Sequence, residues 1–165
     1  MIDNSIGTES SNCYVSLDEA EDYFIDRMHS SNWTSLGDDV KEQLLVTASR
    51  QIDWNIRFDG YKSDVLQSME FPRTGIVLPD GSDLDETIIP IRLKHAVFEM
   101  ALMSIKKDRT LESSLAGISS AKVSVLQVTA SPGGVKSTDP KIIPKAIRNM
   151  LRDFISPNVS FLVRY

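Results

Sequence analysis

The chain has few of the residue types that most often carry out chemistry. Among its 165 residues there are one cysteine and two histidines. Cys13 has no second thiol to pair with, which excludes an internal disulfide and favours a reducing compartment. Neither His29 nor His95 has another histidine or cysteine at the spacing of metal ligands on a helix. We therefore expect no catalytic residue, no metal site, no cofactor and no enzymatic activity.

Long hydrophobic runs are also missing. No apolar stretch approaches the roughly 20 residues of a membrane helix. The first twelve residues lack the basic and apolar regions of a secretory signal, so we expect neither a membrane partner nor export. Hydrophobic residues still make up 41% of the chain, which is enough for the core of one domain.

Two loops contain part of a binding motif. Residues 80–85 carry alternating oxygen ligands, but the central glycine and the late glutamate of a calcium loop are missing. Residues 131–138, SPGGVKST, do not match the glycine and lysine spacing of a phosphate-binding loop. Neither loop indicates a metal or nucleotide site.

Charge is unevenly spread along the chain. Residues 1–80 contain 6 Lys and Arg against 15 Asp and Glu, a balance of −9, whereas residues 81–165 have a balance of +4. Acidic and basic helices of one subunit could pack together. Alternatively, the acidic face of one subunit could meet the basic face of the next, and such a head-to-tail contact can close into a ring.

Hydrophobic periodicity predicts about four helices. We expect them at residues 17–30, 38–56, 90 to about 109, and from Pro144 to the stop at Ser156–Pro157. The first should begin with a capping box, since Ser16 is followed three residues later by a glutamate. In the second, we expect a buried stripe with a spacing of four: Val40, Leu44, Ala48 and Ile52.

Non-helical segments separate these helices. An arm rich in proline and glycine, residues 68–90, contains turn signals at Pro72, Gly75, Pro79 and Gly81. Alternating β-branched residues predict a β excursion, a hairpin, at 118–138. The predicted fold is mainly α: a helical bundle with an inserted arm and a short β excursion before the last helix. The domain should span 14–157, between an N-terminal extension, 1–13, and a C-terminal tail, 158–165.

A run of regularly spaced basic residues in the C-terminal half is a candidate DNA-binding surface. In and just before the last predicted helix, Lys141, Lys145, Arg148 and Arg152 follow one another at spacings of four, three and four. A DNA-binding stripe has this pattern, and so does the solvated face of an ordinary amphipathic helix. Aromatic residues are only 7% of the chain and are not interleaved with these charges as a stacking surface requires.

Several short segments, taken in order, resemble a known family. YVSLDEAEDYF, ASRQID, MEFPRTG, LPDG and LKHAVFEMAL follow one another within residues 13–157. This arrangement is similar to the head–tail connector, or adaptor, proteins of tailed bacteriophages, many of whose relatives carry the label DnaT-like single-stranded-DNA-binding protein. Phe71 stands where relatives often have tryptophan. The most specific positions are Tyr14, Ser16, Glu19, Ala20, Tyr23, Arg50, Ile52, Asp53 and Glu70 through Gly75.

The resemblance implies an assembly role without catalysis. It implies a ring, usually of twelve subunits, between a portal protein and a stopper or tail-completion protein, with genomic DNA passing through the lumen. The protein would then belong to the head–tail junction of the virion, and to the host cytoplasm during assembly. We take this structural virion role as the main expectation. The alternative is a single-stranded-DNA-binding replication accessory protein.

Aromatic and arginine side chains on the arm and in the tail are candidates for partner contacts, because such residues are enriched at interface hot spots. Packing of both segments on the chain's own bundle remains the alternative. The candidate interface residues are Phe71, Pro72, Arg73, Phe161, Leu162, Val163, Arg164 and Tyr165.

Overall fold

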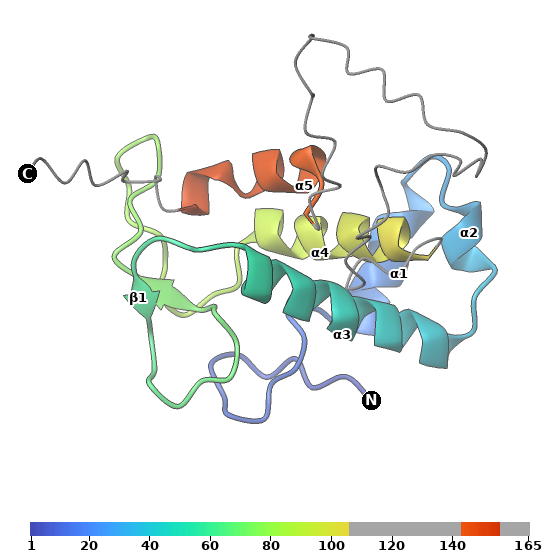
Figure 1. Cartoon of the computed structure of the whole chain (residues 1–165), viewed down its shortest axis with the longest axis horizontal. Helices are drawn as coiled ribbons and strands as arrows, with labels where there is room; N and C mark the ends of the chain where they lie inside the picture. Colours follow the sequence, from blue (N-terminus) through green and yellow to red (C-terminus); the bar gives the residue numbers. More distant parts are fainter. Residues whose placement is uncertain (106–142, 156–165) are drawn as a thin grey trace, which may run out of the picture.

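The fold is mainly helical, as predicted, with one short pair of antiparallel strands (Figure 1). A computed structural model describes residues 1–105 and 143–155. Within these ranges five α-helices, one 3-10 helix and two strands occur. They are α1 (Leu17–Ile25), α2 (Ser31–Thr34), α3 (Asp38–Asn55), β1 (Tyr61–Lys62), β2 (Arg73–Thr74), α4 (Ile91–Ser104), α5 (Lys145–Met150) and η1 (Arg152–Phe154).

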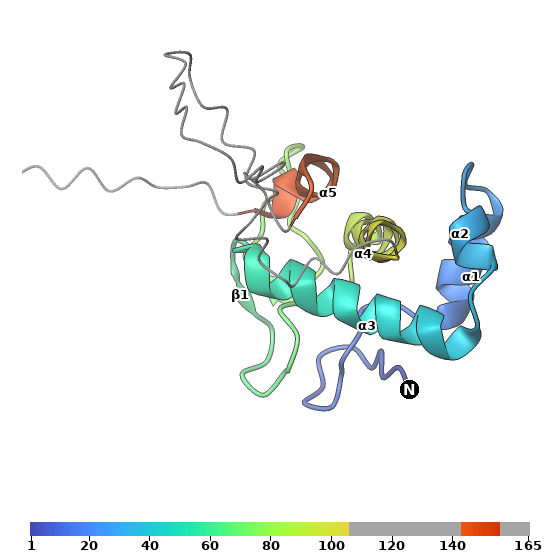
Figure 2. The ribbon, with the colours of Figure 1, turned by 45° about the vertical axis from the view of Figure 1, so that its right-hand side comes forward.

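Helices α3 and α4 form the centre of the bundle. They make the most extensive contact between any two described elements, α5 packs on α4, and α1 touches both central helices. Figure 2 looks nearly along α4 and shows α3 crossing beneath it, with α1 and α2 at one end. The strands and the arm lie at the opposite end, beside the C-terminus of α3 (Figure 1).

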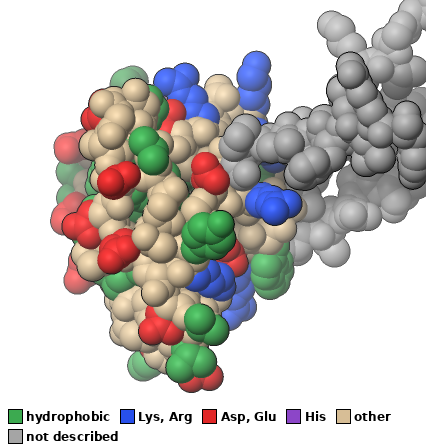
Figure 3. Space-filling model, turned by 90° about the vertical axis from the view of Figure 1, so that its left-hand side faces the viewer, with side chains coloured by type: hydrophobic (Ala, Val, Ile, Leu, Met, Phe, Trp, Pro, Cys, Tyr) green, Lys and Arg blue, Asp and Glu red, His purple; other side chains and the backbone are tan. Residues whose placement is uncertain are grey.

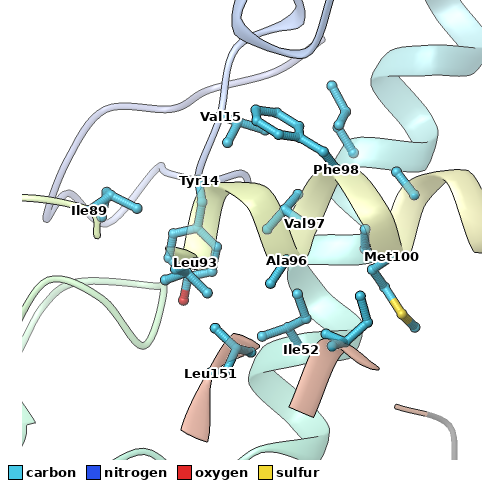
Figure 4. Close-up of a cluster of buried hydrophobic side chains, with 14 of the residues drawn as sticks. Tyr14, Val15, Ile52, Ile89, Leu93, Ala96, Val97, Phe98, Met100 and Leu151 are labelled. Atoms are coloured by element: carbon cyan, nitrogen blue, oxygen red, sulfur yellow. The ribbon is translucent and has the colours of Figure 1, made fainter. Parts of the chain in front are cut away.

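Buried side chains from four segments fill the space between these helices (Figure 4). Ile52 of α3, Leu93 and Val97 of α4, and Leu151 after α5 are completely inaccessible to solvent. Tyr14 enters the same cluster from the segment before α1. Burying each large aliphatic side chain contributes about 1.5–3 kcal/mol, so this cluster supplies much of the energy that holds the helices together.

The first predicted helix is shorter than its sequence suggested. Its capping box is present: Ser16 Oγ accepts from Glu19 N at 3.1 Å, and Ser16 N donates to the Glu19 carboxylate at 3.0 Å. The helix ends at Ile25 rather than near residue 30. His29 then adopts a left-handed conformation, with φ of 62°, and a short helix follows that buries Trp33 completely. The predicted loop therefore contributes to the core.

The buried face of α3 differs from the predicted stripe. Val40 is 44% exposed, whereas Lys41 is buried and Leu45, Ala48 and Ile52 are inaccessible. Lys41 occupies a core position because its ammonium group binds Glu21 at 2.8 Å and lies 5.9 Å from the ring centre of Trp33. At the start of α3 the buried position is therefore residue 41 and not residue 40, and an ion pair and a cation–π contact stabilise the lysine there.

The N-terminal extension is tied to the arm. Asn12 N donates to Asp3 O at 2.8 Å, and Ser68 N donates to Thr8 O at 3.1 Å. Cys13, at the end of the extension, is 1% exposed. The N-terminal extension, residues 1–13, is therefore held by the chain's own arm.

The turn predicted at Gly81 is present in the arm, and the segments on either side of it contact each other. Leu84 N donates to Ile76 O at 2.9 Å, Val77 and Asp83 form an isolated bridge, and Gly81 turns the chain with φ of 85°. The paired strands β1 and β2 join the start of the arm to residues 61–62. The β excursion predicted at 118–138 lies outside the described residues.

Proline starts two helices, as predicted. Pro90 and Pro144 are the N-caps of α4 and α5. The last helix is shorter than expected, because α5 ends at Met150 and continues only as a 3-10 turn to Phe154. No helix among the described residues is both long and apolar enough to span a membrane.

Shortening Phe71 to alanine tests the packing of the arm. Its ring is 1% exposed and meets Phe58 edge-on, with 4.8 Å between ring centres. We expect Phe71→Ala to lower the free energy of unfolding by about 3–5 kcal/mol, measured by urea denaturation. Val65→Ala, at a side chain that is 95% exposed, should change it by less than about 0.5 kcal/mol. Equal effects of the two substitutions would contradict this packing role.

Candidate functional site

Three of the candidate interface residues lie inside the subunit. Phe71 is 1% exposed, Arg73 is 7% exposed, and Pro72 between them is buried and follows a cis peptide bond. Their side chains contact the chain itself, which is the alternative left open for this segment. The other candidates, Phe161 through Tyr165, lie outside the described residues.

Arg73 holds the turn between α3 and the arm. Its Nε donates to Asp59 O at 2.7 Å, Nη2 to Gly60 O at 2.8 Å, and Nη1 to Glu70 Oε2 at 2.7 Å. Gly60 has φ of 66°, and a Cβ there would lie 2.2 Å from Thr74 O. Only glycine fits this close approach, so the turn and the guanidinium group form one rigid unit.

A second network ties the arm to the core. Asp53 accepts hydrogen bonds from the Tyr14 hydroxyl and, at 3.2 Å, from Glu70 N. The Tyr14 oxygen in turn accepts from Glu70 N at 3.1 Å and Phe71 N at 3.3 Å. Burial raises the pKa of Asp53 to about 7, although the hydrogen bonds from Tyr14 and Glu70 act in the opposite direction. Burial and the nearby Asp53 carboxylate raise the pKa of Tyr14.

These two networks explain much of the pattern that carried the family resemblance. Tyr14, Asp53, Glu70 and Arg73 hold the arm to the helices rather than facing solvent. Another specific position, Tyr23, donates to Glu99 at 2.8 Å beside an Arg27–Glu99 ion pair. These positions of the family pattern therefore stabilise the fold and do not themselves form an exposed binding surface.

A wide hollow lies beside these networks. It has a volume of about 910 Å³ and is lined by residues 53–61 together with Glu70, Arg73 and Gly75. Trp54 and Tyr61 stand at its surface, 74% and 78% exposed. Figure 3 shows this end of the molecule, where hydrophobic side chains lie among acidic and basic ones. Two large aromatic side chains so exposed on one short segment indicate a contact surface.

Arginines flank both aromatic side chains. Arg50, Trp54, Arg57 and Tyr61 follow one another at spacings of four, three and four, and all four are exposed. A second hollow of about 310 Å³, lined in part by Arg50, shares Trp54 with the first. We call this set the aromatic–arginine face. Basic and aromatic residues are interleaved here, which the sequence analysis missed because it compared aromatics only with the basic residues of later helices.

Ion pairs neutralise part of the negative charge at the aromatic–arginine face. Glu70 is paired with Arg73 at 2.7 Å and with Lys62 at 3.3 Å. Arg50 and Arg57 are exposed and form no ion pair with any described residue. The face can therefore offer two stacking surfaces and two guanidinium groups.

Two carboxylates of the arm, Asp80 and Asp85, stabilise turns. Asp80 accepts from the hydroxyl and backbone nitrogen of Ser82, and Asp85 does the same for Thr87. These hydrogen bonds lower the pKa of both carboxyl groups. Among the described residues, no group of three or more histidine, cysteine or carboxylate side chains could hold a metal ion.

Comparison with known proteins gives one family. The model of the family described as "Putative DnaT-like ssDNA binding protein" matches residues 1–165. The chain belongs to this family. Searches of curated proteins and of solved structures gave no match. None of these comparisons supports the head–tail connector family of our main expectation, and the family description instead favours the single-stranded-DNA-binding alternative.

The pKa of Asp53 predicts how stability depends on pH. The folded state keeps the Asp53 proton up to about pH 7, whereas an ordinary aspartic acid loses it near 3.8. The folded state therefore binds more protons between these values, and stability falls as the pH rises from 4 to 7. Asp53→Asn has no proton to lose at this position, so it lacks this decrease. Between pH 4 and pH 7, the free energy of unfolding of wild type should therefore fall by more than about 1 kcal/mol relative to that of Asp53→Asn.

Urea denaturation at a series of pH values measures this difference. Asp83→Asn, at an exposed carboxylate on the arm, is the control and should run parallel to wild type. If the Asp53→Asn and wild-type curves are also parallel, the buried carboxyl is not protonated in the folded protein.

Proposed function

We propose that the protein binds single-stranded DNA at the aromatic–arginine face. The observation that carries this proposal is the exposed Trp54, with Arg50 one helical turn before it and Arg57 just beyond the end of α3, in a member of a family described as single-stranded-DNA-binding. Unpaired bases stack on exposed aromatic rings, and guanidinium groups contact the phosphates between them.

With this arrangement we expect the protein to bind single strands more tightly than duplexes. Trp54 and Tyr61 present ring surfaces that an unstacked base can cover, whereas the bases of a duplex already stack on each other. The free charge is small, because Arg50 and Arg57 supply two positive charges here and the whole chain carries −5. We therefore expect modest affinity, and a fall in log K with log salt of about 0.7 for each phosphate contacted.

Removing the Trp54 ring tests this site. Trp54→Ala should weaken binding of a thymidine oligonucleotide by about 1–3 kcal/mol, because one stacking contact is lost. Fluorescence anisotropy of a labelled oligonucleotide measures the affinity. Trp54→Phe should retain part of it.

The matched control lies at the far end of the bundle. Ile25 on α1 is 78% exposed, similar to Trp54, so Ile25→Ala removes exposed apolar surface without touching the aromatic–arginine face. Its affinity should equal that of wild type. Wild-type protein that does not bind the oligonucleotide, or a Trp54→Ala variant that binds as tightly as wild type, would contradict the proposal.

The head–tail adaptor remains the second candidate, and one observation favours it. Val65 and Leu66 are 95% and 70% exposed at the tip of the loop between β1 and β2. The loop is ordered from within: Asp64 accepts from Leu66 N at 2.7 Å, and Gln67 accepts from Asp64 N at 3.0 Å. An ordered apolar tip loses little conformational entropy when it enters a protein interface. In this proposal the ring, portal and stopper contacts, and the virion location, follow from the resemblance.

Charging the tip tests the adaptor proposal. The double substitution Val65→Asp and Leu66→Asp should abolish self-association in sedimentation velocity, because an aspartate cannot be buried unpaired in an apolar contact. The thermal unfolding midpoint should not change, since both side chains are already in water. A wild-type protein that stays monomeric at high concentration, or an assembly unaffected by the charges, would argue against this candidate.

A further inference from the structure

A third hollow, with a different character, lies between α4 and α5. Its volume is about 250 Å³, and its described lining consists of Arg92, His95, Asn149, Met150 and Arg152. Two guanidinium groups, an imidazole and an amide can donate hydrogen bonds into it. Among the described lining residues there is no carboxylate. The hollow is therefore suited to an anion.

A carboxylate beside the hollow sets the direction of both arginines. Arg92 binds Asp153, and Arg152 approaches the same carboxylate with 3.3 Å between Nε and Oδ1. The Asp153 side chain is only 11% exposed, whereas those of Arg92 and Arg152 are 56% and 76% exposed. One negative charge is shared by two positive charges, so a net positive charge remains at the rim of the hollow. The guanidinium groups are positioned before any ligand arrives.

The hollow is close to the aromatic–arginine face. Asp59 N donates to Phe154 O at 2.9 Å, and Phe58 forms a bridge with Ile155. Residues 152–155 therefore lie directly beside the segment that lines the larger hollow. A strand bound at the aromatic–arginine face would reach Arg152 by running past Phe58 and Asp59.

We propose that the hollow formed by Arg92, His95, Asn149 and Arg152 binds a phosphate group. Guanidinium groups recognise phosphate oxygens through paired N–H donors, and two of them converge here. The phosphate is a phosphodiester of the bound DNA strand, and this choice of source rests on the proposed function. The phosphate-binding chemistry itself does not, since a free phosphate group presents the same oxygens.

Three single substitutions separate this role from general charge effects. Arg152→Gln removes one donor from the hollow. Lys145→Gln removes the same charge from an exposed position on α5 that does not line it. Asp153→Asn removes the carboxylate that competes for both guanidinium groups. We expect binding to weaken at least threefold with Arg152→Gln, to stay unchanged with Lys145→Gln, and to strengthen with Asp153→Asn.

Two probes identify the source of the phosphate. The first is inorganic phosphate, titrated into the full-length protein at constant ionic strength and followed by backbone amide NMR. The second is a thymidine oligonucleotide, followed by anisotropy over a range of salt concentrations. Arg152→Gln should also reduce the steepness of the salt dependence by about 0.7, the loss of one phosphate contact.

The outcomes distinguish this inference from the proposed function. If wild type binds the oligonucleotide but Arg152→Gln behaves like Lys145→Gln with both probes, the hollow is not a phosphate site, although DNA binding stands. If inorganic phosphate shifts the amides around Arg152 but no oligonucleotide binds, the phosphate site stands and the proposed DNA binding fails. If neither probe responds to Arg152→Gln or Asp153→Asn, the inference is overturned.

Discussion

The start of the arm is fixed to the core by a buried contact, in which Tyr14 and Asp53 bind each other and the backbone at Glu70 and Phe71. Backbone groups that leave water need partners, and this pair supplies them where no helix or sheet does. The segment before α1, the end of α3 and the start of the arm are thereby held together. Both hollows that contain Trp54 lie against this junction, so the proposed binding face exists only because the arm is fixed.

Burying charged groups near this junction has an energetic cost that hydrogen bonds offset. Arg73 is 7% exposed, but it donates to three backbone carbonyls and one carboxylate. Lys41, at the other end of α3, is buried against Glu21 and the Trp33 ring. Removing one partner of such a pair costs more than the pair contributes, because the remaining charge has no compensation. Both ends of α3 are therefore specified by particular partners as well as by apolar area.

The sequence predicted the helices well where a single periodic face or a cap decided the structure. Pro90, Pro144 and the Ser16–Glu19 capping box mark helix starts that the structure confirms. Prediction failed where a distant partner decided the outcome. The burial of Lys41 depends on Glu21 and Trp33, and no local pattern indicates it. The same holds for Arg73, whose backbone partners come from a turn thirteen and fourteen residues away. The aromatic–arginine face did have a local signal, which is the spacing of basic and aromatic residues from Arg50 to Tyr61. This spacing indicates a binding surface only once the structure shows that all four side chains are exposed.

The turn at the outer end of the arm has a practical consequence for engineering. Gly81 lies in a loop closed by Leu78 and Ser82, and a Cβ built there would have no neighbour within 4 Å. The entropic cost of loop closure rises slowly with length, so a short peptide tag inserted at this turn should add only about 1 kcal/mol to the cost of folding. The arm thus offers an attachment point for a label or an affinity handle, separate from both proposed binding surfaces.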